Sequence, residues 1–155
     1  MKRKLFVMDV DGTLTDGRIY MGSQGEVMKA FDVKDGYGIK MLQKHGIVPV
    51  IITGRTSEIV AARAAELGID QLYQGVPDKL TRLKEIAGCM YLEAKDIAYI
   101  GDDLNDLDCI RYAGLTAAPS DAMEQVKKEV DYVCRHAGGR GAVREFADRI
   151  MGEQD

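Results

Sequence analysis

The chain has 155 residues, a length that fits one domain with a hydrophobic core of its own. Hydrophobic residues make up 46% of it and charged residues 30%, which is typical of globular proteins, and the net charge of −4 argues against a nucleic-acid partner. No signal peptide or membrane span stands out, so we expect a cytoplasmic protein that acts without a membrane partner.

The first predicted elements are a strand and a hairpin. Residues 4–9 contain a short apolar run that predicts a buried strand, and Val10, Asp11 and a Gly-Thr break follow it. Residues 17–32 give two short alternating segments around a Gly-rich turn, which predicts a β-hairpin. The hairpin stands where a simple α/β unit would have its crossover helix. We therefore expect a flap beside the first strand, with an ordinary surface hairpin as the alternative.

From residue 35 onward, helices alternate with strands. Predicted helices cover residues 35–43, 57–67, 79–93 (with a break near Gly88), 104–112, 122–128 and 142–151. Predicted strands cover residues 47–53, 70–74, 97–101, 115–118 and 131–134, although Pro49 counts against a central position for its strand. Glycines at 138–141 predict a mobile linker within a C-terminal tail of residues 137–155. The alternation predicts one α/β domain over residues 1–155, a three-layer, Rossmann-like parallel sheet with right-handed crossovers.

Asp9 and Asp11 stand where the first strand ends. Residues i and i+2 of an extended segment point the same way, so both carboxylates can reach one site. Ligands of open α/β sheets bind at this carboxyl end of the strands. Two facing carboxylates repel each other unless a cation or a proton lies between them, which favours a metal-assisted reaction. A strand exit with two solvated acids is the alternative.

Two later strands also end in polar residues, and a lysine opens the helix between them. The groups concerned are Thr53-Gly54-Arg55, Asp102-Asp103 and Lys79. Because the carboxyl ends of parallel strands share one edge, these segments should converge with the aspartate pair. Taken singly, Thr53 could be a helix N-cap and Lys79 a surface cation. Convergence of several segments argues instead for a common site.

This inventory fits the transfer of a phosphoryl group to a carboxylate. Asp9 would be the nucleophile, and Asp11 would protonate the leaving oxygen and then accept a proton from water. Mg²⁺ prefers hard oxygen ligands, which Asp9, Asp102 and the Asp11 carbonyl would supply. The Thr53 hydroxyl and the Lys79 ammonium would bind the remaining phosphoryl oxygens. Asp103 and Asp106 could be simple first-turn acids of a helix.

The order and spacing of these residues resemble the haloacid dehalogenase superfamily of phosphatases. Its four motifs correspond to residues 9–13 (DVDGT), residues 53–55 (TGR), Lys79 and residues 101–106 (GDDLND). The resemblance implies a Rossmann-like sheet, Mg²⁺ as cofactor, the roles given above and a flap after the first motif. A large cap insertion is absent, and capless relatives commonly close their open site by forming oligomers.

A more specific resemblance is to the 3-deoxy-D-manno-octulosonate 8-phosphate phosphatases. It rests on residues 16–20 (DGRIY), 29–39 (KAFDVKDGYGI), 72–75 (LYQG) and 138–145 (GGRGAVRE). The family implies a homotetramer and a tail that reaches toward an active site. Its substrate-binding positions correspond to Asp11, Asp32, Val33, Lys34, Asp35, Gly36, Lys40, Gly54, Arg55, Arg63 and Lys79. Arginine and lysine donors suit a substrate with a carboxylate and a phosphate.

A sister family acts on the nine-carbon analogue, 2-keto-3-deoxynononate 9-phosphate. It carries Glu at the position of Arg55 and Lys at that of Glu66, whereas Arg63 is common to both families. Arg55 and Glu66 therefore favour the eight-carbon substrate. Asp32 in place of a frequent Asn, and Pro77 before the motif lysine, depart from the pattern of the family.

Two readings of another class stay open. Sialic-acid cytidylyltransferases carry a similar, non-catalytic tetramerisation domain, but that function would allow the acid/base position to decay, and Asp11 is intact. A signalling receiver domain is phosphorylated on an aspartate of a central strand, with other acidic residues earlier in the sequence. In this chain, Ile52-Thr53 stands where that aspartate is expected. Neither histidine (His45 and His136) predicts a site, and the three cysteines (Cys89, Cys109 and Cys134) predict reduced thiols.

Overall fold

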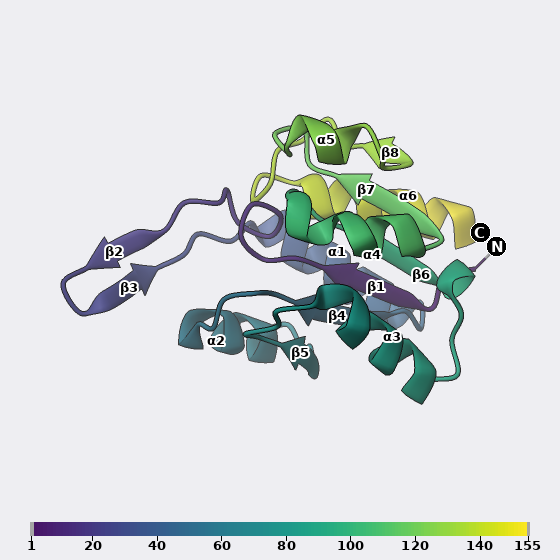
Figure 1. The fold of residues 1–155 in the computed structure, drawn as a ribbon, viewed down its shortest axis with the longest axis horizontal. Helices are drawn as coiled ribbons and strands as arrows, with labels where there is room; N and C mark the ends of the chain where they lie inside the picture. The colour runs from purple at the N-terminus through teal and green to yellow at the C-terminus, as the bar shows by residue number, and fades with distance from the viewer. Residues whose placement is uncertain (1, 155) are drawn as a thin grey trace.

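The computed structural model describes residues 2–154 and shows a parallel sheet between two layers of helices (Figure 1). The sheet has the order β5-β4-β1-β6-β7-β8, and all its pairs are parallel. Its strands are β1 (Leu5–Met8), β4 (Val48–Ile52), β5 (Gln71–Tyr73), β6 (Ile97–Ile100), β7 (Leu115–Ala118) and β8 (Tyr132–Val133). The predicted Rossmann-like α/β fold is confirmed.

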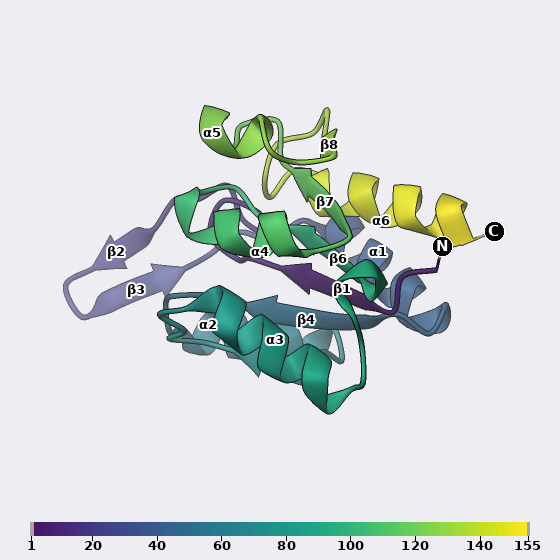
Figure 2. The ribbon, with the colours of Figure 1, turned by 45° about the vertical axis from the view of Figure 1, so that its right-hand side comes forward.

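Within residues 2–154, the α-helices cover the two faces of this sheet, three on each. They are α1 (Val33–Lys44), α2 (Glu58–Glu66), α3 (Lys79–Cys89), α4 (Leu107–Tyr112), α5 (Glu124–Lys127) and α6 (Ala142–Gln154). Phe6 and Met8 of β1 pack in the core cluster with α1, α2 and α6, whereas Leu5 and Val7 pack with α3, α4 and α5. Figure 2 shows α3 and α4 in front of the sheet and α1 behind it. This alternation follows from the twofold period of a strand. Within residues 2–154, no helix combines the length and the apolar character needed to cross a membrane.

The predicted hairpin is confirmed as a separate two-stranded sheet. Its strands β2 (Tyr20–Gly22) and β3 (Gly25–Met28) are antiparallel and extend away from the body of the protein (Figure 1). The hairpin begins just after the turn that follows β1. It therefore starts beside the carboxyl edge of the sheet, and that it acts as a flap stays a prediction.

Register brings the ends of three strands together. Met8 pairs with Ile51 of β4 on one side and with Ile100 of β6 on the other. The residues that follow these strands therefore emerge side by side at one edge. Pro49 is accommodated because the pairing of β4 with β5 begins only at Val50, so the missing N–H costs no ladder hydrogen bond.

Several predicted boundaries were wrong, most clearly the end of the helix predicted over 79–93. Helix α3 runs through Gly88 and ends at Cys89, and residues 94–96 form a separate 3₁₀ turn. Tyr91 adopts φ +56°, and the Leu92 amide donates to the Ala87 carbonyl at 2.9 Å, as in a Schellman motif. A local backbone reversal of this kind is invisible to periodicity.

Other predicted boundaries differ from those of the structure for equally local reasons. Helix α1 begins at Val33, two residues early, because the Asp32 side chain accepts from the Lys34 and Asp35 amides. The segment predicted as a mobile linker, 138–141, is instead held by hydrogen bonds to the body of the protein. The Gly139 amide donates to the Thr13 carbonyl at 3.0 Å.

The remaining differences are small. The helix predicted over 104–112 divides into a 3₁₀ turn, Leu104–Asp106, and α4. The helix predicted over 122–128 is shorter, as is the strand predicted over 131–134.

Candidate active site

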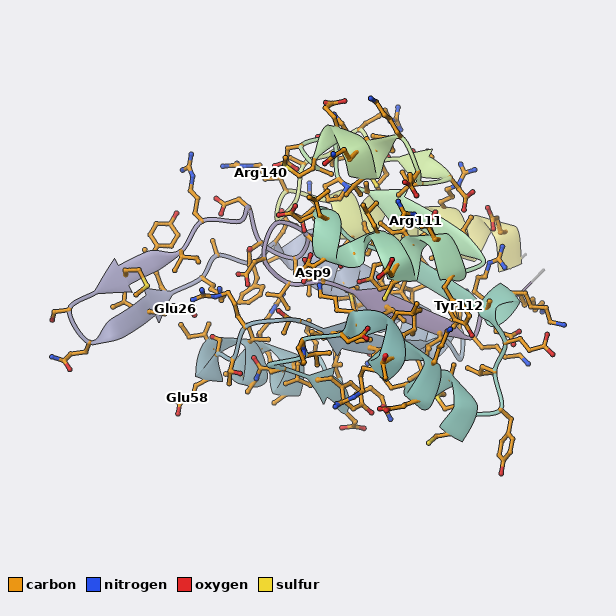
Figure 3. All side chains as sticks on the ribbon, viewed as in Figure 1. Asp9, Glu26, Glu58, Arg111, Tyr112 and Arg140 are labelled. Atoms are coloured by element: carbon orange, nitrogen blue, oxygen red, sulfur yellow. The ribbon has the colours of Figure 1, made fainter. Side chains whose placement is uncertain are left out.

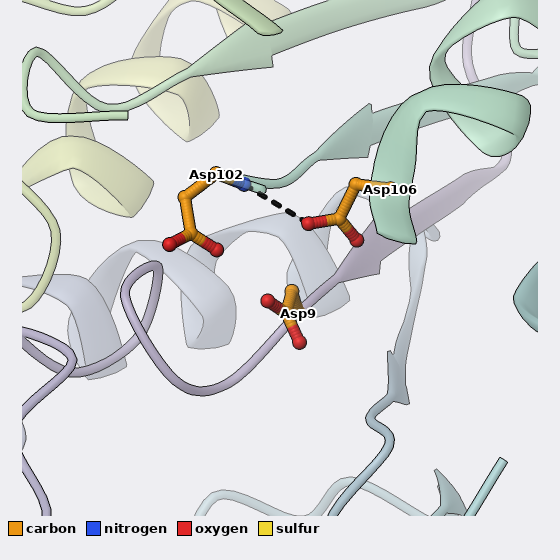
Figure 4. A group of neighbouring side chains, drawn as sticks. All are labelled: Asp9, Asp102 and Asp106. Carbon is orange, nitrogen blue, oxygen red and sulfur yellow. Dashed lines mark hydrogen bonds between the residues drawn. The ribbon is translucent and has the colours of Figure 1, made fainter. Parts of the chain in front are cut away.

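Three aspartates meet at the carboxyl edge of the sheet. Asp9 follows β1, Asp102 follows β6, and Asp106 closes the 3₁₀ turn before α4. One carboxylate oxygen from each lies within 4.8 Å of the others (Figure 4). Asp9 and Asp106 are buried, and Asp102 is partly buried. This grouping places the two predicted carboxylate ligands, Asp9 and Asp102, together.

Lys79 completes this cluster from the opposite side of the edge. It is the first residue of α3, whose N-cap Asp78 accepts from the Thr81 amide and sets the start of the helix. The Lys79 Nζ lies 3.0 Å from Asp9 Oδ1 and 2.9 Å from Asp106 Oδ1. Lys79 is only 4% exposed, so the surface-cation alternative does not fit.

Asp106 organises the loop that carries Asp102. Its Oδ1 accepts from Lys79 and from the Tyr99 hydroxyl, and its Oδ2 accepts from the amides of Asp102 and Asp103 at 3.0 and 3.3 Å. A Cβ at Gly101 would lie 2.4 Å from Asp106 Cγ, so only glycine fits there. Both oxygens of Asp106 are occupied by these donors, which leaves Asp9 and Asp102 as the more accessible carboxylates.

The electrostatics of the cluster call for a cation. Three carboxylates face one ammonium, and burial followed by the neighbouring Asp9 raises the pKa of Asp102. Burial, and then Asp106, likewise raises the pKa of Asp9. Burial opposes the charge on Lys79, but Asp9 and Asp106 outweigh it and raise the pKa of that ammonium. Oxygen ligands with surplus negative charge fit Mg²⁺.

The turn after Asp11 comes close to this cluster. Gly12 has φ +89°, and a Cβ there would lie 1.9 Å from Asp102 Oδ2. The backbone of the turn is therefore packed against the carboxylate, as expected if a main-chain oxygen shares a cation with it. The Thr13 hydroxyl also donates to Asp102 Oδ1 at 3.3 Å. That the Asp11 carbonyl is the oxygen concerned stays a prediction.

The Asp11 side chain faces the flap. The Lys29 Nζ, which follows β3, lies 2.6 Å from Asp11 Oδ1 and 3.3 Å from Glu26 Oε2. The Arg55 Nε lies 3.9 Å from Asp11 Oδ2, and an Arg55 Nη atom lies 3.5 Å from Glu26 Oε2. Figure 3 shows Glu26 on the hairpin, which extends from the end of the sheet where Asp9 lies. Flap and catalytic edge are thus joined by charged groups.

An open pocket of about 160 Å³ lies at this junction. It is lined by Asp9, Asp11, Thr53, Gly54, Arg55, Asp103 and Asn105. Thr53 is buried and positioned by two backbone hydrogen bonds, its amide to the Tyr73 carbonyl and its carbonyl from the Val76 amide. The pocket brings together the predicted nucleophile Asp9, the predicted acid/base Asp11 and Thr53, one of the two predicted phosphate-binding residues.

Other predicted substrate-binding residues lie elsewhere within the single chain. The Arg63 guanidinium is 5.5 Å from the centre of the Phe31 ring and 3.5 Å from the Asp32 carbonyl. It also lies against Gly36, since a Cβ there would be 2.6 Å from an Arg63 Nη atom. Lys40 lies near Gly68, at the end of α2. Both basic side chains contact the α1–α2 junction rather than the pocket.

The predicted segment 32–36 also turns mainly toward other partners. Val33 and Lys34 are exposed, whereas Asp35 is buried and accepts from the Arg144 amide at the start of α6, at 2.9 Å. Burial raises the pKa of Asp35 to about 6. This aspartate therefore joins two helices in the single chain.

Sequence reasoning missed Glu26, Lys29 and Tyr99, and it treated Asp106 as a simple first-turn acid. The first two lie in the hairpin, where alternation predicts strands but does not tell which polar side chain folds back toward Asp11. Tyr99 lies in an apolar strand, so the sequence predicts a core residue. The structure agrees, since Tyr99 has no exposed surface. A polar hydroxyl in a fully apolar strand was the one available signal, because buried tyrosines usually find a partner.

Comparisons with known proteins identify the family of this chain. Residues 71–146 match the sequence model of the haloacid dehalogenase-like hydrolases. The 3-deoxy-D-manno-octulosonate 8-phosphate phosphatase of Yersinia pestis is 47% identical over 152 residues, which cover 98% of this chain and 81% of the relative.

Solved structures give the same result. The 3-deoxy-D-manno-octulosonate 8-phosphate phosphatase of Moraxella catarrhalis, crystallised with a magnesium ion, a phosphate ion and a KDO molecule, superposes with a TM-score of 0.94 at 46% identity. That match covers 97% of this chain and 86% of the other. The cobalt-bound phosphatase of Haemophilus influenzae reaches a TM-score of 0.96 at 40% identity, covering 99% and 90%.

Proposed function

We propose a function on the basis of the family: this chain belongs to the 3-deoxy-D-manno-octulosonate 8-phosphate phosphatases of the haloacid dehalogenase-like hydrolases. It hydrolyses this sugar-acid phosphate with Mg²⁺ through a phosphorylated Asp9. The family makes it a phosphoric monoester hydrolase. The observation that carries the proposal is the buried cluster of Asp9, Lys79, Asp102 and Asp106 beside an open pocket. The identity of the eight-carbon sugar rests on the relatives and on Arg55.

The first half of the reaction moves the phosphoryl group to the protein. The Asp9 carboxylate attacks phosphorus, and the ester bond between phosphorus and the sugar oxygen breaks. Asp11 donates its proton to that oxygen, which leaves as the sugar hydroxyl. Thr53 and Lys79 hold phosphoryl oxygens as charge develops on them. When bound to Asp9 and Asp102, Mg²⁺ supplies positive charge that screens the repulsion between Asp9 and the phosphate.

The second half returns the protein to its starting state. A water oxygen attacks phosphorus, and Asp11, now a carboxylate, takes the proton from that water. The bond between Asp9 and phosphorus breaks, so inorganic phosphate forms and the Asp9 carboxylate is restored. The pocket is open on one side, which gives water access to the phosphorylated Asp9.

Specificity would come from the groups around the pocket mouth. Arg55 is half-exposed there, so its guanidinium can meet a substrate carboxylate. The nine-carbon substrate is the second candidate, and the presence of Arg rather than Glu at position 55 disfavours it. A non-catalytic tetramerisation domain fits less well, because such a domain has no need for the acidic cluster and its lysine.

We also expect a homotetramer. The hairpin exposes a group of large apolar side chains, namely Ile19, Met21, Val27 and Met28. Such a patch suits contact with another copy of the chain. An assembly would also supply a use for Arg63 and for residues 32–36, which lie away from the pocket of their own chain. Light scattering of the purified protein measures this directly.

The function is tested by phosphate release with Mg²⁺ from both sugar-acid phosphates. We expect the eight-carbon substrate to give the higher kcat/KM and Asp9→Asn to release no phosphate. Arg55→Glu should shift the ratio of the two kcat/KM values toward the nine-carbon substrate. Release from neither sugar by the wild-type protein would refute the proposed function.

A further inference from the structure

Lys29 occupies an unusual position for a lysine on a hairpin. It directly follows β3, yet its side chain has no exposed surface. Its Nζ lies 2.6 Å from Asp11 Oδ1 and 3.3 Å from Glu26 Oε2. A buried ammonium is costly unless it is paired, so these two carboxylates fix where it can lie.

Glu26 connects this lysine to the body of the protein. Glu26 Oε1 accepts from the Ser57 hydroxyl at 2.8 Å, and Ser57 is the N-cap of α2. Glu26 Oε2 is near both Lys29 and Arg55. The position of the Lys29 ammonium is therefore set by a helix of the main scaffold as well as by the flap.

The contact with Lys29 makes the two oxygens of Asp11 different. An ammonium donates hydrogen bonds and cannot accept them, so Asp11 Oδ1 must act as the acceptor. A proton carried by Asp11 then belongs on Oδ2. The Arg55 Nε lies 3.9 Å from that oxygen, too far for a hydrogen bond, and Arg55 and Asp11 both line the pocket in which the leaving group of a substrate would lie.

We propose that Lys29 is a positioning residue that holds the Asp11 carboxyl with Oδ2 toward the leaving oxygen, so that the flap is part of the proton-transfer apparatus. The inference rests on the proposed function, in which Asp11 is the acid and base. Lys29 keeps all its protons throughout. The proton moves from Asp11 Oδ2 to the leaving oxygen as the ester bond breaks, and later from water to the same Oδ2.

This role predicts an effect that depends on the leaving group. An alkoxide leaving group needs the proton of Asp11, whereas p-nitrophenolate leaves without one. A loss of Lys29 should therefore harm alkyl phosphates far more than p-nitrophenyl phosphate. The relevant quantity is kcat/KM, because it reports the steps up to the transfer of the phosphoryl group to Asp9 and not the later hydrolysis.

The experiment measures kcat/KM with Mg²⁺ for a series of alkyl and aryl phosphates of graded leaving-group pKa. For Lys29→Met, we expect a fall of roughly 100-fold on alkyl phosphates, the lower part of the range for a general acid, and a few-fold at most on p-nitrophenyl phosphate. Lys29→Arg should recover most of the loss because it keeps a cation beside Asp11. Lys44→Met, which removes an exposed lysine of α1, is the matched control.

The results separate this inference from the proposed function. An equal fall on all phosphates, or no fall on any, would overturn the role of Lys29, provided that thermal unfolding shows a folded variant. A leaving-group dependence that steepens in Lys29→Met supports it. If the wild-type protein hydrolyses the series but not the eight-carbon sugar phosphate, the substrate assignment is wrong while the role of Lys29 is still decided by the series.

Discussion

The catalytic edge and the flap side of the pocket are built in opposite ways. Lys79 and Asp106 are 4% and 0% exposed, and each is held by several charged or polar partners. Across the pocket, the Arg55 side chain is 48% exposed, and Met21 on the flap is 64% exposed. Groups that bind and transfer a phosphoryl group need fixed geometry. Groups that select the rest of the substrate lie at exposed positions, where a side chain can be substituted without disturbing the packing of the core.

Burial also makes the two sides respond differently to mutation. In the edge cluster, each charge compensates another, so removing one leaves an unpaired charge in a place from which water is excluded. At the exposed positions of the flap side, such as Arg55 and Met21, a lost side chain is replaced by solvent. The difference predicts that variants of the buried edge lose stability and activity together, while variants of exposed residues at the pocket mouth, such as Arg55, change substrate binding alone. Lys29, which is buried, is not one of these exposed residues.

The largest effect should come from Lys79→Met. The change leaves Asp9 and Asp106 without their shared cation, which we expect to cost about 3–5 kcal/mol of unfolding free energy and to abolish phosphate release. Urea unfolding and a phosphate assay measure the two losses. Lys95→Met, at an exposed pair with Glu93, should change stability by about 1 kcal/mol or less. Equal effects of the two variants would contradict the contrast.

Arg55→Ala should act on binding and not on folding. Removing a guanidinium that meets a substrate carboxylate costs about 1.5–3 kcal/mol, which corresponds to a rise in KM of roughly 10- to 100-fold with a much smaller change in kcat. Steady-state kinetics on the eight-carbon sugar phosphate test this. Arg82→Ala, on α3 and away from the pocket, is the control. A fall in kcat with unchanged KM would place Arg55 among the catalytic groups instead.

Tyr99→Phe probes whether the edge depends on a hydroxyl that never touches the substrate. Without its donor, Asp106 loses one of the bonds that orient the Asp102 loop, so we expect about a 10-fold weaker apparent affinity for Mg²⁺. Stability should fall by about 1–3 kcal/mol. Activity measured against Mg²⁺ concentration tests the first effect. Tyr91→Phe, at an exposed position, should change neither quantity.

Asp35→Asn should leave kcat unchanged and alter only how stability depends on pH. Burial raises the pKa of Asp35 from 3.8 to about 6, so the folded protein holds this proton more tightly than the unfolded chain does. The carboxyl therefore destabilises the fold increasingly as pH rises from about 4 to 6, by about 3 kcal/mol in all. Asparagine has no proton to lose.

The test of Asp35 is the unfolding free energy of both proteins across that range. The difference should grow in favour of the variant from pH 4 to 6 and then stay level. Asp70→Asn, at an exposed position, should run parallel to the wild type. Parallel curves for Asp35→Asn would show that its carboxyl is not penalised by burial, and a fall in kcat would assign it to the chemistry.

The edge could be predicted from the sequence because parallel strands bring distant residues together by rule. Asp9, Thr53 and Asp102 each follow a recognisable strand, and Lys79 opens a recognisable helix. The register of the sheet then aligns the ends of these strands, as the pairing of Met8 with Ile51 and Ile100 shows. No such rule governs the flap. Lys29 reaches Asp11 because it lies at the base of the hairpin, directly after β3, and its position in an alternating segment gives no sign of that.

The same distinction applies to the substrate-binding residues that rest on the resemblance, which stay predictions. In the single chain, Arg63 and Lys40 contact the α1–α2 junction. The Asp35 carboxylate holds the start of α6. Where these side chains lie depends on which face of a helix they occupy and on how that helix packs against its neighbours. The sequence pattern of one segment does not reveal that packing.

The most direct test of the account is whether Asp9 carries the phosphoryl group. The protein is mixed with the eight-carbon sugar phosphate and Mg²⁺, quenched in acid within one turnover and digested for mass spectrometry. We expect one phosphoryl group on the peptide that contains Asp9, and none on the same peptide of Asp9→Asn. Phosphate release by the wild type without any phosphorylated peptide, or a phosphoryl group on another residue, would contradict the assignment of the buried edge as the centre of the chemistry.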